Sequence, residues 1–348
     1  MRLRVPRSGL LEALEQAYQV HRGEEPRTLP ARIVAYHRPS EAKPSTRTPL
    51  LGGDWYVLGL PRQHPVTAMQ ALAVTRAVRG ALLAHGTQPS PEILSGHQQH
   101  PDGDRDVTPP ANRPHLAIIP LINAGHRHSD GSVFGVALVL PENCPDEERT
   151  AVEDAFRAWD AAGLELTLPG GSGIRPFPRP LEDLGVDRAE AGRDWLEAAL
   201  TNRRRTTTRD YWCRAAKDWV TVTPIALDRF PGNLRSRNPR AGERAEAEAA
   251  ASIARACVFA GLTDSAEDVR VTVRLDAPLT GIPAAPGGRV HPGRRQFPGY
   301  QTGSGAPRVC VHAEISFPEP VCGPVLVGAG RYLGYGLCLP SGSKGAAS

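Results

Sequence analysis

Three histidines lie close together in the first half of the sequence. His126 and His128 belong to a polar loop between two apolar runs, and His115 stands at the base of the run that leads into this loop. Imidazoles titrate near neutral pH, so a group of them can provide a general base and a general acid without a metal. Cleavage of RNA by transesterification needs that pair, one group for the 2′-hydroxyl proton and another for the departing 5′-oxygen. All three are therefore candidate catalytic residues.

Two other interpretations of the histidine loop stay open. In an extended conformation His126 and His128 point to the same face and Asp130 follows two positions later, which permits a metal site of two histidines and one carboxylate. Asp130-Gly131 also suits an ordinary hairpin turn. The histidines would then be surface residues that, like Arg127 between them, contact RNA phosphate or a neighbouring part of the protein. We expect no metal and no other cofactor.

A glycine-rich segment near the end of the sequence has the composition of a phosphate-binding loop. Gly328, Gly330 and Gly334 surround Arg331 between two apolar runs. Glycine lacks a Cβ, so such a loop can bring backbone N–H groups against a phosphate chain. The glycine spacing differs from that of a dinucleotide-binding fingerprint, and the Gly-Lys-Ser/Thr order of a P-loop is absent from the sequence. The alternative is a glycine-containing hairpin that only closes a sheet.

Basic residues are concentrated between positions 203 and 244, although the net charge of the chain is only +4. Arginine predominates over lysine there, and its planar guanidinium suits phosphate recognition. A solvated surface is the alternative. Besides Arg331 and the three glycines, the candidate RNA-binding residues are Arg127, Lys217, Arg229, Arg270 and Arg274.

Composition limits the class of protein. A chain of 348 residues is long enough for two domains. The six cysteines include no C-x-x-C pair, which argues against a zinc ribbon or a disulfide framework and is compatible with free thiols in a reducing compartment. The sequence has no signal-peptide pattern and no run of 18 apolar residues. We expect a soluble, cytoplasmic protein without membrane contact.

Hydrophobic patterning predicts the elements that position these residues. The first 108 residues contain only weak signals, namely helices near 8–23 and 65–86 and a strand at 55–60. Stronger signals follow, with strands at 116–122 and 133–140, a helix at 145–163, a strand at 219–227, a helix at 245–260, and strands at 269–275, 309–315 and 334–339. The second half thus has the order β-α-β-β-loop-β, a ferredoxin-like order in which the glycine segment replaces the second helix. A four-stranded sheet of this type is a common RNA platform.

Taken together, the motifs resemble a CRISPR-associated protein of type I-G systems, formerly type I-U. In that family a Cas-five-like backbone subunit is fused to a Cas-six-like guide-RNA endoribonuclease. The resemblance covers about residues 94–340. It rests on Ser95-Gly96-His97, His115-Leu116-Ala117 with Pro120-Leu121, the loop from Gly125 to Gly131, Trp219 to Pro224, Leu227-Asp228-Arg229, Ala254 to Cys257, and Gly323 to Leu337.

The resemblance implies an α+β fold of tandem ferredoxin-like domains of the RRM/RAMP type with a C-terminal glycine-rich loop. Residues 1–108 would be a remnant of the Cas-five-like region with a linker, because the family usually begins with a longer portion. Residues 109–200 would be the first ferredoxin-like domain and residues 201–340 the second, which includes the glycine-rich loop. Residues 341–348 would be a flexible tail.

The same resemblance implies an activity and partners. The protein would bind the repeat of precursor CRISPR RNA and cleave it as a metal-independent endoribonuclease, through attack of the 2′-hydroxyl, leaving a 2′,3′-cyclic phosphate. It would keep the mature CRISPR RNA within an antiviral interference complex, beside the backbone and large subunits, and meet target DNA only indirectly. The alternative is a non-catalytic subunit that binds guide RNA in the same complex.

Overall fold

The structure is a computed structural model, and it describes residues 2–6, 15, 31–35, 49–60, 66–98, 113–168, 173–174, 176–178, 209–288, 296–302 and 305–341. The chain divides into two units, Met1–Lys43 and Pro44–Ser348. In the first unit, strand β1 (Arg2–Pro6) pairs antiparallel with β2 (Ala31–Ala35). Apart from Glu15, the helix predicted near 8–23 lies outside the described residues, and so does the predicted tail after Ser341.

The second unit begins with an antiparallel sheet whose strands lie side by side in the order β9-β3-β6-β5. Trp55 on β3 is opposite Val139 on β6, and Val139 is opposite Ala117 on β5. The apolar runs predicted as strands are confirmed as β3, β5 and β6, and every residue of β5 is buried. The bounds of the strands are β3 (Leu51–Gly59), β4 (Val66–Thr67), β5 (Ala117–Ile122), β6 (Ser132–Pro141) and β9 (Phe177–Pro178), with β7 (Leu166–Thr167) and β8 (Gly173–Ile174) as a short pair.

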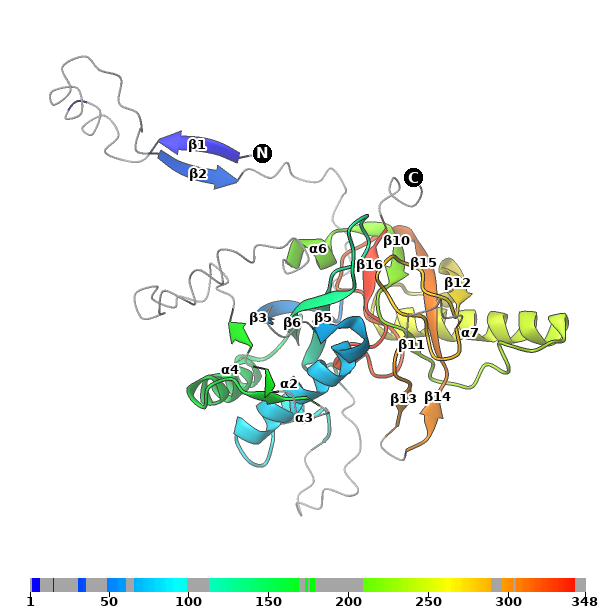
Figure 1. The fold of residues 1–348 in the computed structure, drawn as a ribbon, viewed down its shortest axis with the longest axis horizontal. Helices are drawn as coiled ribbons and strands as arrows, with labels where there is room; N and C mark the ends of the chain where they lie inside the picture. The colour runs from blue at the N-terminus through cyan, green and yellow to red at the C-terminus, as the bar shows by residue number, and fades with distance from the viewer. Residues whose placement is uncertain are drawn as a thin grey trace. The chain divides into compact units, whose positions relative to one another are not determined.

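Helices cover one face of this first sheet (Figure 1). Helix α2 (Ala71–His85) follows the 3₁₀ helix η1 (Ala68–Gln70), and α4 (Asp146–Ala161) packs beside α2. Helix α4 confirms the helix predicted at 145–163, with three acids in its first turn, where they complement the helix dipole. Between α2 and β5 lies the single turn α3 (Glu92–Ser95).

The predicted boundary after residue 108 divides this sheet and needs correction. Strand β3 and helix α2 precede that boundary, yet β3 pairs with β6 and α2 packs against β5. The residues from Leu51 onward are thus the first strand and helix of the layer that we assigned to 109–200. Local patterning did not reveal this, because the hydrogen-bond partners of β3 lie about eighty positions later in the chain. The boundary predicted between 200 and 201 lies outside the described residues.

The second sheet has the strand order β16-β10-β15-β12. The short strand β11 pairs with Cys310 and Val311 at the start of β15. The strands predicted at 269–275 and 309–315 are confirmed. The run predicted as one strand at 219–227 is divided between β10 and β11, and the predicted last strand is shorter than expected. The bounds are β10 (Ala216–Thr221), β11 (Ile225–Ala226), β12 (Arg270–Arg274), β15 (Cys310–Val321) and β16 (Cys338–Pro340). Smaller elements are α6 (Arg209–Cys213), β13 (Tyr300–Gln301), β14 (Pro307–Arg308), and the 3₁₀ helices η4 (Ala266–Asp268) and η5 (Arg331–Leu333).

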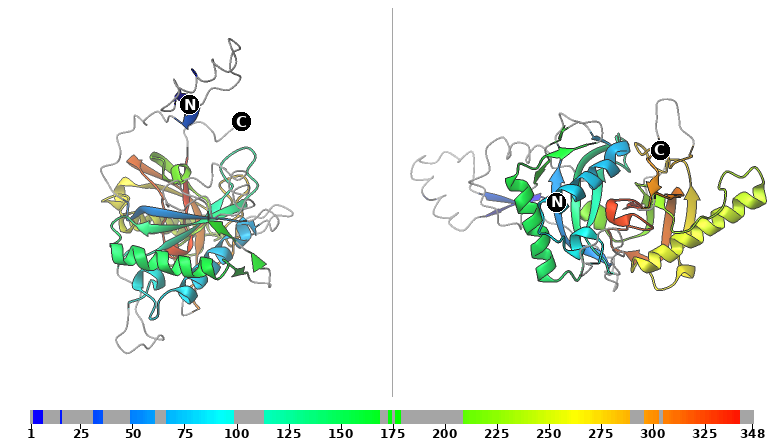
Figure 2. Two further views of the ribbon diagram at one scale, coloured as in Figure 1. Left: turned by 90° about the vertical axis from the view of Figure 1, so that its left-hand side faces the viewer. Right: turned by 90° about the horizontal axis from the view of Figure 1, so that it is seen from below.

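Helix α7 (Pro239–Phe259) covers the outer face of the second sheet (Figure 2). It begins where the side chain of Asn238 accepts a hydrogen bond from the backbone N–H of Arg240, with proline at the first helical position. The predicted apolar spacing of four is confirmed, because Ala245, Ala249, Ile253 and Cys257 are all buried. The helix thus packs on the sheet by one narrow face and leaves the other in solvent.

The two sheets share a core. Trp219 and Ile315 of the second sheet point into the cluster beneath α7, whereas Val220 and Leu339 join the buried cluster of the first sheet. Both faces of the central strands of the second sheet are therefore covered by protein. The exposed residues of edge strand β12 are Arg270, Thr272 and Arg274. The sheet as a whole is not an open platform for RNA, contrary to our expectation.

Candidate active site

The glycine-rich segment packs against the first sheet. Gly334 has a φ of +83°, and a Cβ placed on it would lie 2.6 Å from Cδ of Pro120 in β5. The carbonyl oxygen of Gly334 accepts a hydrogen bond from the Thr223 hydroxyl at 2.6 Å. A Cβ on Gly328 would lie 2.6 Å from the carbonyl oxygen of Ala226. These two buried glycines therefore permit close backbone packing. We had predicted that they bind phosphate, but their backbone is not accessible to one.

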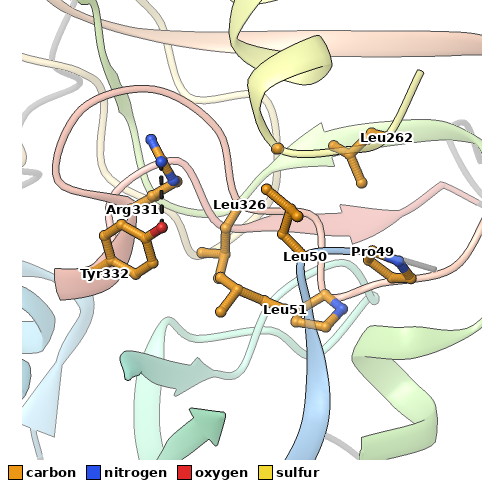
Figure 3. Close-up of a pocket in the computed structure, with 9 residues that line it drawn as sticks. Pro49, Leu50, Leu51, Leu262, Leu326, Arg331 and Tyr332 are labelled. Atoms are coloured by element: carbon orange, nitrogen blue, oxygen red, sulfur yellow. Dashed lines mark hydrogen bonds between the residues drawn. The ribbon is translucent and has the colours of Figure 1, made fainter. Parts of the chain in front are cut away.

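This packing places η5 beside the base of β5. The imidazole of His115 stacks on the ring of Tyr332, with ring centroids 3.6 Å apart and 31° between the planes. The guanidinium of Arg331 lies over the Tyr332 ring, 4.7 Å from its centroid, and donates a 3.3 Å hydrogen bond to the phenol oxygen (Figure 3). Two residues predicted from the sequence, His115 and Arg331, thus meet through a tyrosine that the sequence analysis did not consider.

A second arginine reaches the same imidazole from α2. Arg79 donates a hydrogen bond to the backbone oxygen of Ser95 at the end of α3. A Cβ on the next residue, Gly96, would lie 2.8 Å from Nη2 of Arg79 and 2.6 Å from Nε2 of His115. The glycine, with φ +67°, therefore lets both side chains approach the α3 turn. Sequence reasoning missed Arg79, although the Ser95-Gly96-His97 motif pointed to this turn.

The surroundings keep His115 neutral. Burial lowers its pKa to about 4, and the charge of Arg79 lowers it further. The Arg113 backbone opposes this, and the charges of Arg331 and His97 add smaller lowering effects. Its Nδ1 is buried without a hydrogen-bond partner among the residues described. A half-buried neutral imidazole beside two guanidinium groups can accept a proton while the cations stabilise developing negative charge.

His126 and His128 lie elsewhere, in the exposed loop at the other end of β5. The backbone N–H of His128 donates to Nδ1 of His126 at 3.2 Å, so the remaining proton of a neutral His126 is on Nε2, 2.6 Å from Oδ1 of Asn123. Both ring nitrogens of His126 are thus engaged within the loop. These contacts support the turn interpretation of this loop.

The three predicted histidines do not form one group. His115 precedes the six-residue strand β5 and His126 follows it, and at about 3.3 Å per residue the strand alone separates them by roughly 20 Å. The histidine loop instead packs on β16 and α6, because a Cβ on Gly125 would lie 2.5 Å from Cδ2 of Leu339 and Tyr211 donates to the backbone oxygen of Ala124 at 2.8 Å. The glycine segment therefore meets His115 alone.

The ligand atoms of the alternative metal site are engaged in hydrogen bonds within the loop. Oδ1 of Asp130 accepts hydrogen bonds from Nδ2 of Asn123 at 2.7 Å and from the backbone of Ser132 at 3.0 Å. Partial burial raises the pKa of Asp130, but these hydrogen bonds outweigh it and the pKa is lowered overall. Within the described ranges, no group of three or more His, Cys, Asp or Glu side chains is arranged to hold a metal ion.

The other predicted RNA-binding residues are dispersed. Lys217 donates to the backbone oxygen of Pro318 at 2.5 Å, and Arg274 forms a 2.6 Å ion pair with Glu314. Arg127, Arg229 and Arg270 are exposed, on the histidine loop, after β11 and on β12. Of the cations that we predicted to bind RNA, Arg331 is the one whose charge acts on His115.

His312 on β15 is a buried structural residue. Its Nε2 is 3.0 Å from the backbone oxygen of Pro283, and its Nδ1 is 2.9 Å from the hydroxyl of Thr221. Burial lowers its pKa to about 4. The loop that carries Pro283 covers this face of β15, which the sequence of the strand itself does not show.

The described residues form an α+β protein in which an imidazole and two guanidinium groups gather where two antiparallel sheets meet. The sequence matches the family described as CRISPR-associated protein, GSU0054 family, over residues 1–340. The protein therefore belongs to this CRISPR-associated family, and the match includes the region 1–108 that we had assigned to a remnant.

Other comparisons add little. No curated protein matches the sequence. Among solved structures, Csf5, described as a CRISPR-Cas type IV Cas6 crRNA endonuclease, aligns with 83% of this chain and 98% of its own, at 13% sequence identity and a TM-score of 0.38. Similarity at this level does not establish a common fold. In the described part of the chain, every helix is too short or too polar to span a membrane.

Proposed function

We propose that this CRISPR-associated protein is an endoribonuclease that cleaves the repeat of precursor CRISPR RNA, with His115 as its general base. The observation that carries the proposal is the neutral imidazole of His115, stacked on Tyr332 beside Arg79 and Arg331. A neutral imidazole is the form that accepts a proton, and guanidinium groups suit the phosphate that must be positioned next to it. Family membership supplies the class of RNA.

In this mechanism His115 takes the proton of the 2′-hydroxyl, and the 2′-oxygen attacks the adjacent phosphorus. Half-buried Arg331 contacts the phosphate and stabilises the charge of the pentacoordinate phosphorane. Arg79 holds the α3 turn and keeps the imidazole in place. His97, which is close enough for its charge to lower the pKa of His115, protonates the departing 5′-oxygen. The products are a 2′,3′-cyclic phosphate and a 5′-hydroxyl, and no step requires a metal.

The topology supports a tandem ferredoxin-like interpretation of the RAMP type. The first sheet follows the chain order β3-α2-β5-β6-α4-β9 and the second follows β10-α7-β12-β15-η5-β16. In each, the fourth strand lies beside the first and the third lies between the first and the second. On this interpretation η5 with its glycines stands in place of the second helix, as the sequence indicated, and carries Arg331 and Tyr332 to the first domain.

The wider role that we propose is that of the type I-G family. The protein would act in the cytoplasm and remain on the mature CRISPR RNA within an interference complex, in contact with the backbone and large subunits and only indirectly with target DNA. The non-catalytic alternative, a subunit that holds guide RNA without cutting it, shares these partners and differs only in its chemistry.

Single-turnover cleavage of a repeat RNA, transcribed from a CRISPR array of the same genome, tests the proposal. His115→Ala should lower the rate at least ~100-fold, the low end for one general acid or base. The variants His126→Ala and His128→Ala are matched controls and should retain most of the rate. Cleavage should persist with EDTA and yield the cyclic phosphate.

Three results would contradict this assignment. Full activity of His115→Ala would place the base elsewhere. Loss of activity with EDTA would favour a metal-dependent hydrolase. Tight binding of the repeat RNA without any cleavage by the unmodified protein would favour the non-catalytic subunit.

A further inference from the structure

The solvent face of α7 carries a row of arginines that ends in an exposed aromatic ring. Arg240, Arg244, Arg255 and Phe259 follow one another at intervals of four, eleven and four residues, which places them on one side of the helix. All four are exposed, and Phe259 is 71% exposed. The opposite side of the helix is the buried one. We call these four residues the α7 face.

The arginines of the α7 face are available to a partner. Glu248 lies on the same side of the helix, but none of the three arginines forms an ion pair within the part of the chain that the structure describes. By contrast, the arginines of α4 are already neutralised: half-buried Arg149 pairs with Asp54 and Asp146, and exposed Arg157 pairs with Glu153 and Asp154. Three arginines against Glu248 leave this face positive, although α7 as a whole, with Glu243 and Glu246 on its other sides, carries no net charge.

The C-terminal end of this face leads to the candidate active site. Phe259 is followed by Ala260 and Leu262, which line a shallow pocket together with Arg331 and Tyr332 (Figure 3). The remaining walls of the pocket are apolar and are formed by Pro49, Leu50, Leu51, Pro324 and Leu326. At 1.5 Å per residue, the 21 residues of α7 extend roughly 30 Å away from the pocket.

We propose that the α7 face forms the path of the single-stranded RNA that flanks the cleaved repeat. Phe259 stacks on a base that follows the phosphate on Arg331, and the three arginines contact phosphates further along the strand. Arginine without lysine, next to an exposed aromatic ring, is the pattern of a single-stranded nucleic-acid track and is less suited to an acidic protein. The inference rests on the proposed function and adds the path that the flanking RNA takes across the protein.

Binding of two RNAs to the full-length protein tests this path. One is the repeat alone, and the other is the repeat with a single-stranded uridine flank on the side that leaves the site. The double variant R240A/R244A should bind the flanked RNA at least about tenfold more weakly than the unmodified protein, and the repeat alone equally well. The slope of log K against log salt for the flanked RNA should become shallower by about 1.4, for two phosphate contacts on a single strand.

The control is R149A/R157A, which also removes two helical arginines, both already paired with carboxylates, and should bind both RNAs as the unmodified protein does. Phe259→Ala should weaken binding of the flanked RNA alone. Equal weakening on both RNAs would assign the arginines to the repeat and overturn the path. Unchanged binding and cleavage of both RNAs would overturn the path while leaving the proposed function intact. An unmodified protein that neither binds nor cleaves the repeat would overturn both.

Discussion

The imidazole of His115 and the phenol ring of Tyr332 are stacked with their centroids 3.6 Å apart, although they belong to the first and last thirds of the chain. The contact joins the base of β5 to the 3₁₀ helix η5, which the second sheet presents between β15 and β16. Thr75 on α2 reinforces it by donating a 2.9 Å hydrogen bond to the backbone oxygen of Leu333. The candidate site is thus a product of the packing of one sheet on the other.

The stack on Tyr332 should help to keep the pKa of His115 low and the cleavage rate high. In Tyr332→Ala the imidazole gains solvent, so the pKa of His115 should rise from about 4 toward its ordinary value of 6.5, and the cleavage rate of bound RNA should fall. Tyr332→Phe keeps the ring and removes only the hydroxyl that Arg331 contacts, so it should stay close to the unmodified protein. NMR titration of the ring protons of His115 measures the pKa. An unshifted titration in Tyr332→Ala would refute this dependence.

Bound RNA should raise the pKa of His115. Arg79 and Arg331 lower it by their charge, and a phosphate beside them cancels part of that charge. The acidic limb of kcat should therefore lie at higher pH than the acidic limb of kcat/KM, because the first reports the complex and the second the free protein. The measurement is a pH–rate profile between about pH 4 and 8. Identical limbs in both profiles would contradict phosphate binding next to these arginines.

Gly96→Ala should impair cleavage while leaving the rest of the fold intact. The new Cβ would lie within 3 Å of both His115 and Arg79, and the positive φ adds strain. Gly80→Ala is the matched control, since Gly80 is exposed in α2 and its Cβ would have no neighbour within 4 Å among the described atoms. It should keep full activity and gain up to about 1 kcal/mol of unfolding free energy from helix propensity. Activity and urea unfolding of both variants provide the comparison. Normal cleavage by Gly96→Ala would contradict the site.

His312 should make the protein less stable in acid. Its pKa is about 4 when folded and near 6.5 when unfolded, so at intermediate pH the unfolded chain binds the extra proton and stability falls as pH decreases. The expected loss between pH 7 and pH 4.5 is on the order of 2–3 kcal/mol, and His115 acts in the same direction with a smaller effect because it is partly exposed. Urea unfolding at both pH values measures it. His312→Asn should have a shallower pH dependence, whatever its absolute stability, and an equally steep one would refute the assignment.

Local patterning in the sequence determined most of the secondary structure. The apolar runs before and after the histidine loop are β5 and β6, the acid-rich start at Asp146 begins α4, and the spacing of four residues from Ala245 to Cys257 identifies the buried side of α7. These features depend on periods of two and 3.6 residues, which are properties of neighbouring positions. The chain order of the second sheet followed from them.

Only the tertiary structure decided which of the predicted residues meet. Three histidines close in sequence are separated because β5 runs straight between His115 and His126, whereas His115 and Tyr332 come together because the glycine segment of the second sheet packs on the first. Contacts between distant segments also bury His312 beneath the loop of Pro283 and bring Trp55 into the first sheet opposite Val139. Contacts between distant segments depend on how complete sheets pack, and no local period in the sequence records that.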